Sequence, residues 1–335
     1  MRRVPLSRAA QLHPFLRALD HLGAPTEGLI EQHKLPPRLL EGGGGLVSTR
    51  AAFGFVQDIG RRQGIDDFGW RVADPQLAQM SPRLRRALMR CHTLLSALEQ
   101  ICARASGESS NLAFWFEEQQ DAVFFCHRGS LEVGAPGADA ASLTRTAIVI
   151  SAIRLFMGPD WVPVECGLAL EGEIGPVVRE GLRDARVRRT PDHGWLRLPR
   201  SILAHPPQTR VPVQTRTGTE ADKEPSLDLV DSLAQLVRPY LSRKPPTIEA
   251  VADLAGMSVR TLQRDLAAAG TSYRDLLLGV KLDSARELLR QPEVKMLEIA
   301  GETGFNDQAH FSRFVKAMTG MNPREYRSTL LGDHL

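Results

Sequence analysis

The sequence predicts two domains of different fold class: an N-terminal mixed α/β (α+β) domain over residues 1–205, and an all-α C-terminal domain over residues 227–330 with two helix-turn-helix units. Three observations lead to this expectation. A helix-turn-helix pattern occurs twice, the segment 206–226 lacks apolar periodicity, and helical and strand-like patterns follow one another upstream. A chain of 335 residues also exceeds the usual size of a single hydrophobic core.

In the N-terminal part, apolar residues recur with helical spacing in some segments and alternate in shorter ones. Helices are expected at Leu6–Leu22, Thr49–Gln63, Ser81–Ala105 and Ala138–Met157. The segments Asn111–Glu117 and Asp121–Arg128 are predicted to form a hairpin, and further strands are expected at Val162–Glu171 and Gly194–Leu198. The segment 206–226, rich in Pro, Thr and charged residues, is interpreted as an interdomain linker.

Helix start and stop signals divide the C-terminal part into helices. These are expected at Leu227–Leu241, Ile248–Ala255, Val259–Ala269, Ser272–Arg290, Glu293–Gly301 and Gln308–Met318, with a short last helix from Pro323. The predicted N-caps, whose side-chain oxygens accept free amides of the first turn, are Thr247, Ser258, either Asn306 or Asp307, and Asn322. Gly270 and Gly320 are predicted to end their helices, and Asn322 with Glu325 forms a capping-box variant.

The last third of the chain carries one structural pattern twice. Ala252 precedes Gly256 by four residues, and Ala300 precedes Gly304 by the same interval, 48 residues further on. A small Ala lets a second helix cross closely, and Gly permits the sharp turn between the two helices. Each copy continues with a hydrophobic residue, a polar capping residue and an amphipathic helix, so the sequence predicts two helix-turn-helix units.

In a helix-turn-helix, the second helix enters the major groove of DNA, and planar side chains such as Arg and Gln read base edges. In the first unit, Leu262 and Leu266 are expected to face the core, because they are four residues apart on one helix face. The candidate DNA-contacting residues on the other face are Arg260, Thr261, Gln263 and Arg264.

In the second unit, Phe311, Phe314 and Val315 supply the predicted buried side of the recognition helix. The residues left for DNA are Gln308, Ala309, His310, Ser312, Arg313 and Lys316, with Lys316 expected on a phosphate. The alternative is that these polar residues only form solvent-exposed helix faces. It is less favoured because both recognition helices have an apolar side and an opposite side rich in polar residues. If the helix Ser272–Arg290 is rigid, it fixes the separation of the two recognition helices. One chain could then contact two successive major-groove segments, which lie about 34 Å apart.

The overall charge does not support DNA binding, and the composition does not favour a membrane, secreted or metal-binding protein. The net charge is +3, with 27 Lys and Arg against 22 Asp and Glu in residues 1–219, and 15 against 17 in residues 220–335. Neither a membrane-length apolar run nor a secretion signal is expected, which indicates a cytoplasmic protein without a membrane partner. The four cysteines are scattered singly, so we expect reduced thiols, no metal site and no cofactor.

Residues 243–328 resemble the DNA-binding domain of the AraC/XylS family of bacterial transcription regulators. The resemblance rests on MSVRTLQRDL, AAAGTSYRDLL, KLDSARELL and EIAGETGFNDQAHFSRFVKAMTGMNPREYR. It implies seven helices, with DNA contacts at Arg260, Gln263, Arg264, Gln308, Ala309, His310, Ser312 and Arg313. Val315 replaces an aromatic residue usual in the family, which implies lighter packing. Ala309 cannot hydrogen-bond through its side chain, which implies weaker base readout by the second unit.

Residues 20–205 resemble an effector domain that occurs upstream of this module, and not the jelly-roll sugar-binding domain of the arabinose regulator. The resemblance implies a transcription regulator controlled by an unidentified small-molecule effector, with an activator favoured over a repressor. It also implies RNA polymerase as a partner and leaves a homodimer open. The aromatic residues of the predicted hairpin are interpreted as core rather than pocket, and a basic cluster as a solvated face: Phe114, Trp115, Phe116, Phe124 and Phe125, and Arg83, Arg85, Arg86 and Arg90. Enzyme motifs do not stand out, although a fused catalytic N-terminal domain is kept as an alternative.

Overall fold

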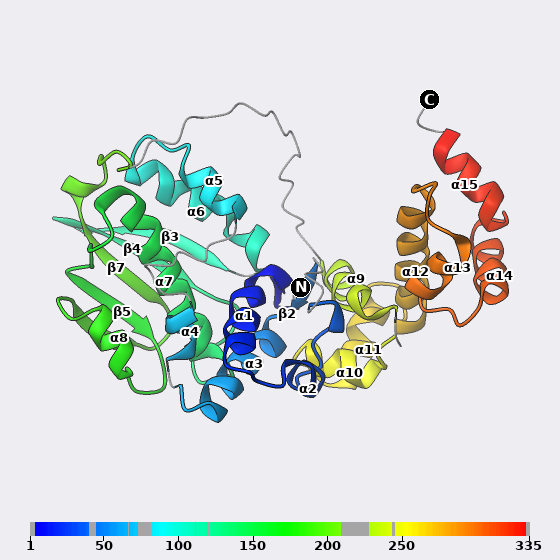
Figure 1. The fold of residues 1–335 in the computed structure, drawn as a ribbon, viewed down its shortest axis with the longest axis horizontal. Helices are drawn as coiled ribbons and strands as arrows, with labels where there is room; N and C mark the ends of the chain where they lie inside the picture. The colour runs from blue at the N-terminus through cyan, green and yellow to red at the C-terminus, as the bar shows by residue number, and fades with distance from the viewer. Residues whose placement is uncertain are drawn as a thin grey trace.

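The computed structural model describes residues 4–39, 45–65, 67–72, 82–110, 112–119, 121–208, 228–242 and 245–332. Figure 1 shows a mixed α/β unit built from the N-terminal part and a separate group of helices built from the C-terminal part. Residues 209–226 of the predicted linker and residue 227 lie outside the described residues, so the domain boundaries stay a prediction.

A five-stranded mixed sheet forms the centre of the N-terminal unit. Its strand order is β3 (Ala113–Glu118), β4 (Ala122–Arg128), β7 (Gly194–Pro199), β5 (Glu165–Ala169) and β6 (Arg186–Thr190). Neighbouring strands are antiparallel except for the parallel pair β5–β6. The predicted hairpin is confirmed as β3–β4, and the predicted strands as β5 and β7. The strand β6 was missed, because its sequence RVRRT has little apolar alternation on an exposed sheet edge.

Two long helices cover one face of this sheet and form the main core with it. They are α6 (Leu94–Glu108) and α7 (Ala138–Met157), and their buried side chains pack with those of β4, β5 and β7. Among the described residues, α7 alone is long and apolar enough to span a membrane by length and composition. The structure uses it as a core helix, because 72% of its most apolar window is buried.

A second core beside α7 is enclosed by α1 (His13–His21), α2 (Thr26–Gln32), α3 (Thr49–Arg62) and α4 (Phe68–Val72), with the 3-10 turns η1 (Ala9–Leu12) and η2 (Pro37–Leu39). Two further helices, α5 (Pro82–Leu88) and α8 (Pro176–Gly181), and the 3-10 turn η3 (Arg200–Ile202) pack on the main core. The predictions for α3 and α7 are confirmed, whereas α2, α4 and α8 were not predicted.

Two predicted helices of the N-terminal part were wrong in extent. Leu6–Arg8 is the strand β1, which pairs antiparallel with β2 (Leu46–Ser48), and the helical turns follow it. The predicted helix Ser81–Ala105 is divided into α5 and α6. The division lies before α6, where Thr93 and Ser96 form a capping box that starts a new helix. Local capping and long-range strand pairing therefore prevailed over helical periodicity.

The C-terminal unit contains seven α-helices within residues 228–332, as the resemblance implied. They are α9 (Leu229–Val237), α10 (Ile248–Leu254), α11 (Val259–Ala268), α12 (Tyr273–Leu289), α13 (Met296–Glu302), α14 (Gln308–Thr319) and α15 (Pro323–Gly332), with a 3-10 turn η4 (Arg238–Tyr240) after α9. The pairs α10–α11 and α13–α14 are the two predicted helix-turn-helix units. The predicted caps are confirmed at Thr247, Ser258, Asp307 and Asn322, each of which accepts a backbone amide.

Helix α12 joins the two units by taking part in both of their hydrophobic cores. Leu276 and Val280 pack with the first unit, whereas Ala285 and Leu289 pack with the second. Buried side chains near each end of one continuous helix hold the two units in a fixed relation. Helix α12 is thus continuous between the two units, and its rigidity stays a prediction.

The repeated Ala and Gly residues have the predicted geometry. Ala252 and Ala300 are 2% and 1% exposed, so both are covered by the crossing helix. Gly256 and Gly304 have φ of +69° and +74°, which favours glycine because a Cβ is strained in this region. A Cβ on Gly304 would also overlap the carbonyl oxygen of Leu241.

We expect Gly304→Ala to destabilise the C-terminal unit more than Gly320→Ala. Gly320 also has a positive φ, +78°, but a Cβ there would have no atom within 4 Å. Gly320→Ala should cost about 1–2 kcal/mol for the conformation alone, and Gly304→Ala a further ~1–3 kcal/mol for the overlap. Urea unfolding of both variants measures the difference, and equal losses would contradict the close approach at Gly304.

Candidate nucleic-acid interface and N-terminal cavity

The first recognition helix, α11, exposes the predicted contact residues on one side. Leu262 and Leu266 are 0% and 1% exposed and pack in the core of the first unit. Arg260, Gln263 and Arg264 are exposed. The structure therefore brings these three side chains together on the solvent face of α11, as the spacing predicted.

Two of the predicted contacts in α11 already have partners within the helix. The Thr261 hydroxyl lies 2.9 Å from the Ser258 hydroxyl at the N-cap, and Thr261 is half-buried. The Arg264 guanidinium donates to Asp265 Oδ1 over 2.8 and 3.0 Å. An ion pair this exposed contributes little free energy, so the guanidinium can exchange Asp265 for another acceptor.

The second recognition helix, α14, begins at the N-cap Asp307, whose carboxylate accepts the backbone amide of His310 over 2.6 Å. This hydrogen bond lowers the pKa of Asp307. Phe311 and Val315 are fully buried and Phe314 is half-buried, as predicted. Exposed on the other side are Gln308, Ala309, His310, Arg313 and Lys316. Ser312 is half-buried, and its hydroxyl donates to the Gln308 carbonyl over 2.8 Å.

Helices α12 and α14 form a basic groove of about 470 Å³ that the sequence did not predict. His310 and Arg313 line it from α14, and Arg274 and Lys281 line it from α12. Lys281 lies 4.2 Å from the centre of the Phe305 ring and donates to the Gly304 carbonyl over 3.0 Å. Arg274 and Lys281 are seven residues apart on one helix face, and this spacing was the available signal.

The N-terminal unit encloses a cavity of about 520 Å³ between α1, α3, α6, α7 and β3. Among the hairpin aromatics, Phe114 lines this cavity, whereas Phe125 is fully buried in the sheet core. The core interpretation was therefore right for Phe125 but incomplete for Phe114. In the basic cluster, Arg85, Arg86 and Arg90 are exposed on and beside α5, and the side chain of Arg83 lies outside the described residues.

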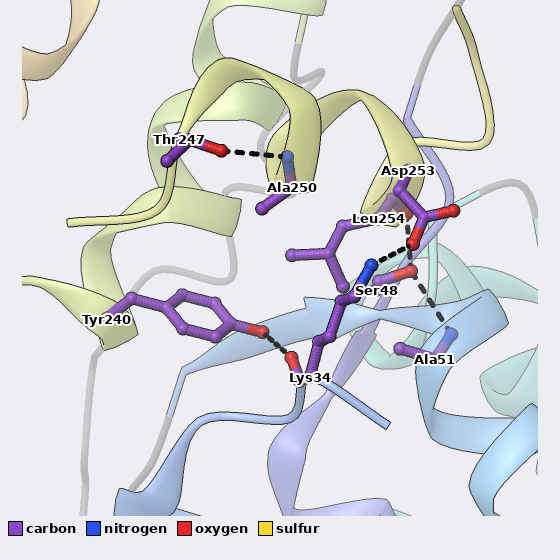
Figure 2. Close-up of polar contacts among 8 residues, drawn as sticks. All are labelled: Lys34, Ser48, Ala51, Tyr240, Thr247, Ala250, Asp253 and Leu254. Carbon is purple, nitrogen blue, oxygen red and sulfur yellow. Dashed lines mark hydrogen bonds and ion pairs between the residues drawn. The ribbon is translucent and has the colours of Figure 1, made fainter. Parts of the chain in front are cut away.

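Polar contacts join the N-terminal unit to the first helix-turn-helix unit (Figure 2). Lys34 Nζ lies 2.6 Å from Asp253 Oδ2, and the Tyr240 hydroxyl donates to the Lys34 carbonyl over 2.7 Å. The Ser48 hydroxyl donates to the Leu254 carbonyl over 2.6 Å. Burial raises the pKa of Tyr240, so the phenol stays protonated and remains a hydrogen-bond donor.

The same contact has an apolar part. Val4 and Leu6, at the start of the chain, are 0% exposed and pack in the core of the first unit beside Leu229 and Leu233 of α9. The strand pair β1–β2 thus takes part in both units, because Val47 packs in the N-terminal core and Leu6 in the core of the first helix-turn-helix unit.

Three potential metal ligands come together on the sheet, where the sequence analysis expected no metal site. The ligand atoms of Glu117, Cys126 and His193 lie within 4.8 Å of one another. Trp115 donates to Glu117 over 2.8 Å, and His193 Nδ1 lies 2.8 Å from Asp192 Oδ1. The group could hold a cation, but burial raises the pKa of Cys126 to about 12, which disfavours the thiolate that zinc requires.

The fold of residues 228–332 defines a class: proteins that present two helix-turn-helix recognition helices on one scaffold. Residues 251–329 match a family model described as a helix-turn-helix domain. Residues 23–211, more than half of the chain, match the model of the arabinose-binding N-terminal domain of AraC transcription regulators. The chain therefore belongs to the AraC family, whose members are transcription regulators rather than enzymes.

Individual relatives match only part of their length. The ornithine utilization regulator of Pseudomonas aeruginosa is 30% identical over 138 residues, 40% of this chain and 41% of that protein. The transcriptional activator RhaS of Escherichia coli is 38% identical over 80 residues, 24% of this chain and 29% of that protein. The crystal structure of the regulator CdpR from Pseudomonas aeruginosa is 18% identical, with 95% of this chain and 98% of that chain covered at a TM-score of 0.39.

We expect Ser258→Ala to destabilise the first helix-turn-helix unit by about 0.5–2 kcal/mol, because the Ser258 hydroxyl accepts the Thr261 amide at the start of α11. Ser312→Ala is the matched control, since the Ser312 hydroxyl only bonds back to a carbonyl inside α14 and Ala is the better helix former. Chemical unfolding compares the two variants. A loss at Ser312 as large as that at Ser258 would contradict the capping role.

Proposed function

We propose that the chain is a sequence-specific transcription activator of the cytoplasm that binds double-stranded DNA in the major groove under the control of a small-molecule effector. The carrying observation is the pair of exposed polar faces on α11 and α14, held in fixed relation by α12. RNA polymerase and a second copy of the chain are further proposed partners. The activator role is supported by the name of the relative RhaS, a transcriptional activator.

The proposed DNA contacts divide by side-chain chemistry. On α11, Arg260, Gln263 and Arg264 have the planar donor groups that read guanine or adenine, and we assign Thr261 to a phosphate or sugar contact. The second set acts at bases or backbone: Gln308, His310, Ser312 and Arg313, with Ala309 limited to apolar contact. Lys316 is assigned to a phosphate, and the basic groove adds Arg274 and Lys281.

Effector control is supported by the position of the strand pair β1–β2, between the cavity and the first helix-turn-helix unit. Thr49 and Ser109 line the cavity, and both hydroxyls hydrogen-bond to the Ser7 hydroxyl in β1, over 2.8 and 3.0 Å. Leu6, next to Ser7 in β1, packs in the core of the first unit. Ser48, next to Thr49 at the end of β2, hydrogen-bonds to Leu254. A ligand that shifts the cavity wall would therefore act on this contact.

Strain at Lys34 also points to a regulated contact. Lys34 has φ of +53°, a value unfavourable for a residue with a Cβ, and it is unique in this respect among the non-glycine residues in the described ranges. Its carbonyl accepts from Tyr240 and its ammonium group pairs with Asp253. Strained conformations persist where surrounding contacts hold them, and they concentrate in switch regions. Release of the contact would relax Lys34 and free the first unit.

Sequence-specific binding is tested with Arg264→Ala. We expect a loss of about 1–3 kcal/mol for the specific site and little change for scrambled DNA, because a base contact carries sequence information. Arg85→Ala, which removes an exposed arginine from the N-terminal unit, is the matched control. The measurement is a binding titration against the upstream region of its own gene at physiological salt. Equal affinity of the unaltered protein for both DNAs would refute specificity.

Control through the interdomain contact is tested with Tyr240→Phe. The variant keeps the ring but removes the hydroxyl that donates to Lys34, so the contact weakens by about 0.5–1.5 kcal/mol. We expect DNA affinity without effector to rise by up to that amount. Tyr326→Phe is the control, because the Tyr326 hydroxyl accepts from Arg286 inside the second unit. No gain for Tyr240→Phe, or an equal gain for both variants, would argue against a restraining contact.

A further inference from the structure

We infer that the N-terminal cavity binds a small apolar molecule with one anionic group, such as an aliphatic or aromatic carboxylate. The inference rests on the proposed function, in which this cavity takes the effector. It goes further by naming the chemical class of the ligand, which the sequence did not predict. Three features of the cavity carry it: an enclosed arginine, two further polar atoms without partners, and walls that are largely apolar.

Arg145, on α7, is the central feature. Protein surrounds its guanidinium, the surface that it retains faces the cavity, and burial lowers the pKa of Arg145 to about 10, so the group stays charged at neutral pH. It makes no hydrogen bond or ion pair with any residue in the described ranges, and its Nε is fully enclosed. A buried charge without a counter-charge is costly, so an anion in the cavity would relieve that cost.

Two neighbouring side chains complete a polar end of the cavity. His13 Nε2 and Ser130 Oγ are buried, line the same cavity and have no partner among the described residues. Both can donate a hydrogen bond to a carboxylate oxygen. Burial, with the charge of Arg17 adding to it, lowers the pKa of His13, and a bound anion would oppose that shift.

Other charged groups line the cavity as well. Arg17, Arg104 and Glu108 lie in its wall, and Arg104 donates to Gln100. Next to the cavity, burial and the charge of Arg145 hold the pKa of His127 well below its usual value, so His127 adds no charge. Arg145 therefore supplies the charge that favours an anion over a cation or a neutral ligand.

Most of the remaining wall is apolar, so an apolar body is expected for the ligand. Phe15, Phe53, Leu84, Ile101, Phe114 and Ile148 line the cavity. A volume of about 520 Å³ is within the range of small-molecule sites. The polar side chains Gln11, Thr49, Ser109 and Thr144 also line it, but each already hydrogen-bonds within the protein: Gln11 to the Glu108 carbonyl, Thr49 and Ser109 to the Ser7 hydroxyl, and Thr144 to the carbonyls of Gly69 and Ala140. A sugar would need several further hydrogen-bonding partners for its hydroxyls. The cavity therefore suits an apolar acid better than a carbohydrate.

Gly129 explains how the guanidinium is held in place. A Cβ on Gly129 would overlap Nη1 and Cζ of Arg145, so the guanidinium lies directly against the backbone at this position. Gly129→Ala would keep the charge of Arg145 but push it aside, because the overlapped atoms are the end of a flexible side chain. This variant separates the position of the charge from its presence.

Binding is tested by calorimetry and thermal shift on the full chain with octanoate and phenylacetate as aliphatic and aromatic probes. Octanol, phenylethanol and arabinose are the neutral comparisons. We expect at least one of the acids to bind and raise the Tm, and the neutral molecules to bind roughly 10- to 150-fold more weakly, as expected for loss of a charge-assisted hydrogen bond. Equal binding of an acid and its alcohol, or stabilisation by arabinose alone, would overturn the inference.

Variants locate the site. Arg145→Gln and Gly129→Ala should each weaken acid binding, and Arg85→Gln, on the exposed face of α5, should leave it unchanged. Without ligand, Arg145→Gln should unfold at the same or a higher temperature, since it removes an uncompensated buried charge. A large drop in the ligand-free Tm would show that Arg145 has a structural role instead, and unaltered acid affinity in Arg145→Gln would refute the assignment.

Failure of this inference is distinguishable from failure of the proposed function. If an acid binds through Arg145 but DNA affinity is the same with and without it, the ligand class stands and effector control fails. If a neutral metabolite changes DNA affinity while the acids do not bind, effector control stands and the ligand class is wrong.

Discussion

The strand pair β1–β2 is the element on which the arrangement of the two units depends, because its side chains enter two different cores. Val47 packs in the N-terminal core beside α1 and α3, whereas Val4 and Leu6 pack against α9. Three residues in each strand suffice, since a two-stranded ribbon with one face in each core is stabilised by both. The ribbon also connects the cavity wall to the first helix-turn-helix unit, because Ser7 in β1 hydrogen-bonds to Thr49 and Ser109, which line the cavity.

In the C-terminal unit, the single helix α12 links the two helix-turn-helix units. Helix α12 links the two recognition helices because it buries side chains in both of their cores. Such a link is what simultaneous contact with two groove segments would require. The apolar residues of α12 do not form a single stripe, because the N-terminal half of the helix packs in the core of the first unit and the C-terminal half in the core of the second. The first recognition helix carries more planar donor groups than the second. The second recognition helix packs on its core through the fully buried Val315, and the basic groove lies beside it.

Much of the C-terminal unit could be predicted because its signals are local. Caps such as Ser258 and Asp307, and turns such as those at Gly256 and Gly304, depend on residues no more than four positions apart in the sequence. In the N-terminal part, long-range contacts decided the outcome. Leu6–Arg8 joined a strand 40 residues away instead of a helix, and β6 became a strand by parallel pairing with β5 despite a polar sequence. The cavity was missed for the same reason.

The sequence by itself determined the two helix-turn-helix units, their caps and turns, and the exposed faces of α11 and α14, since periodicity and capping are properties of neighbouring residues. The regulator class followed from the resemblance of this segment to a known family. Only the tertiary structure decided which buried polar groups lack partners. His13, Ser130 and Arg145 come from α1, the loop after β4 and α7, and nothing in their spacing places them around one cavity. The contact of Lys34 with Tyr240 and Asp253 likewise joins residues more than 200 positions apart. Burial and charge compensation arise only when distant segments pack together.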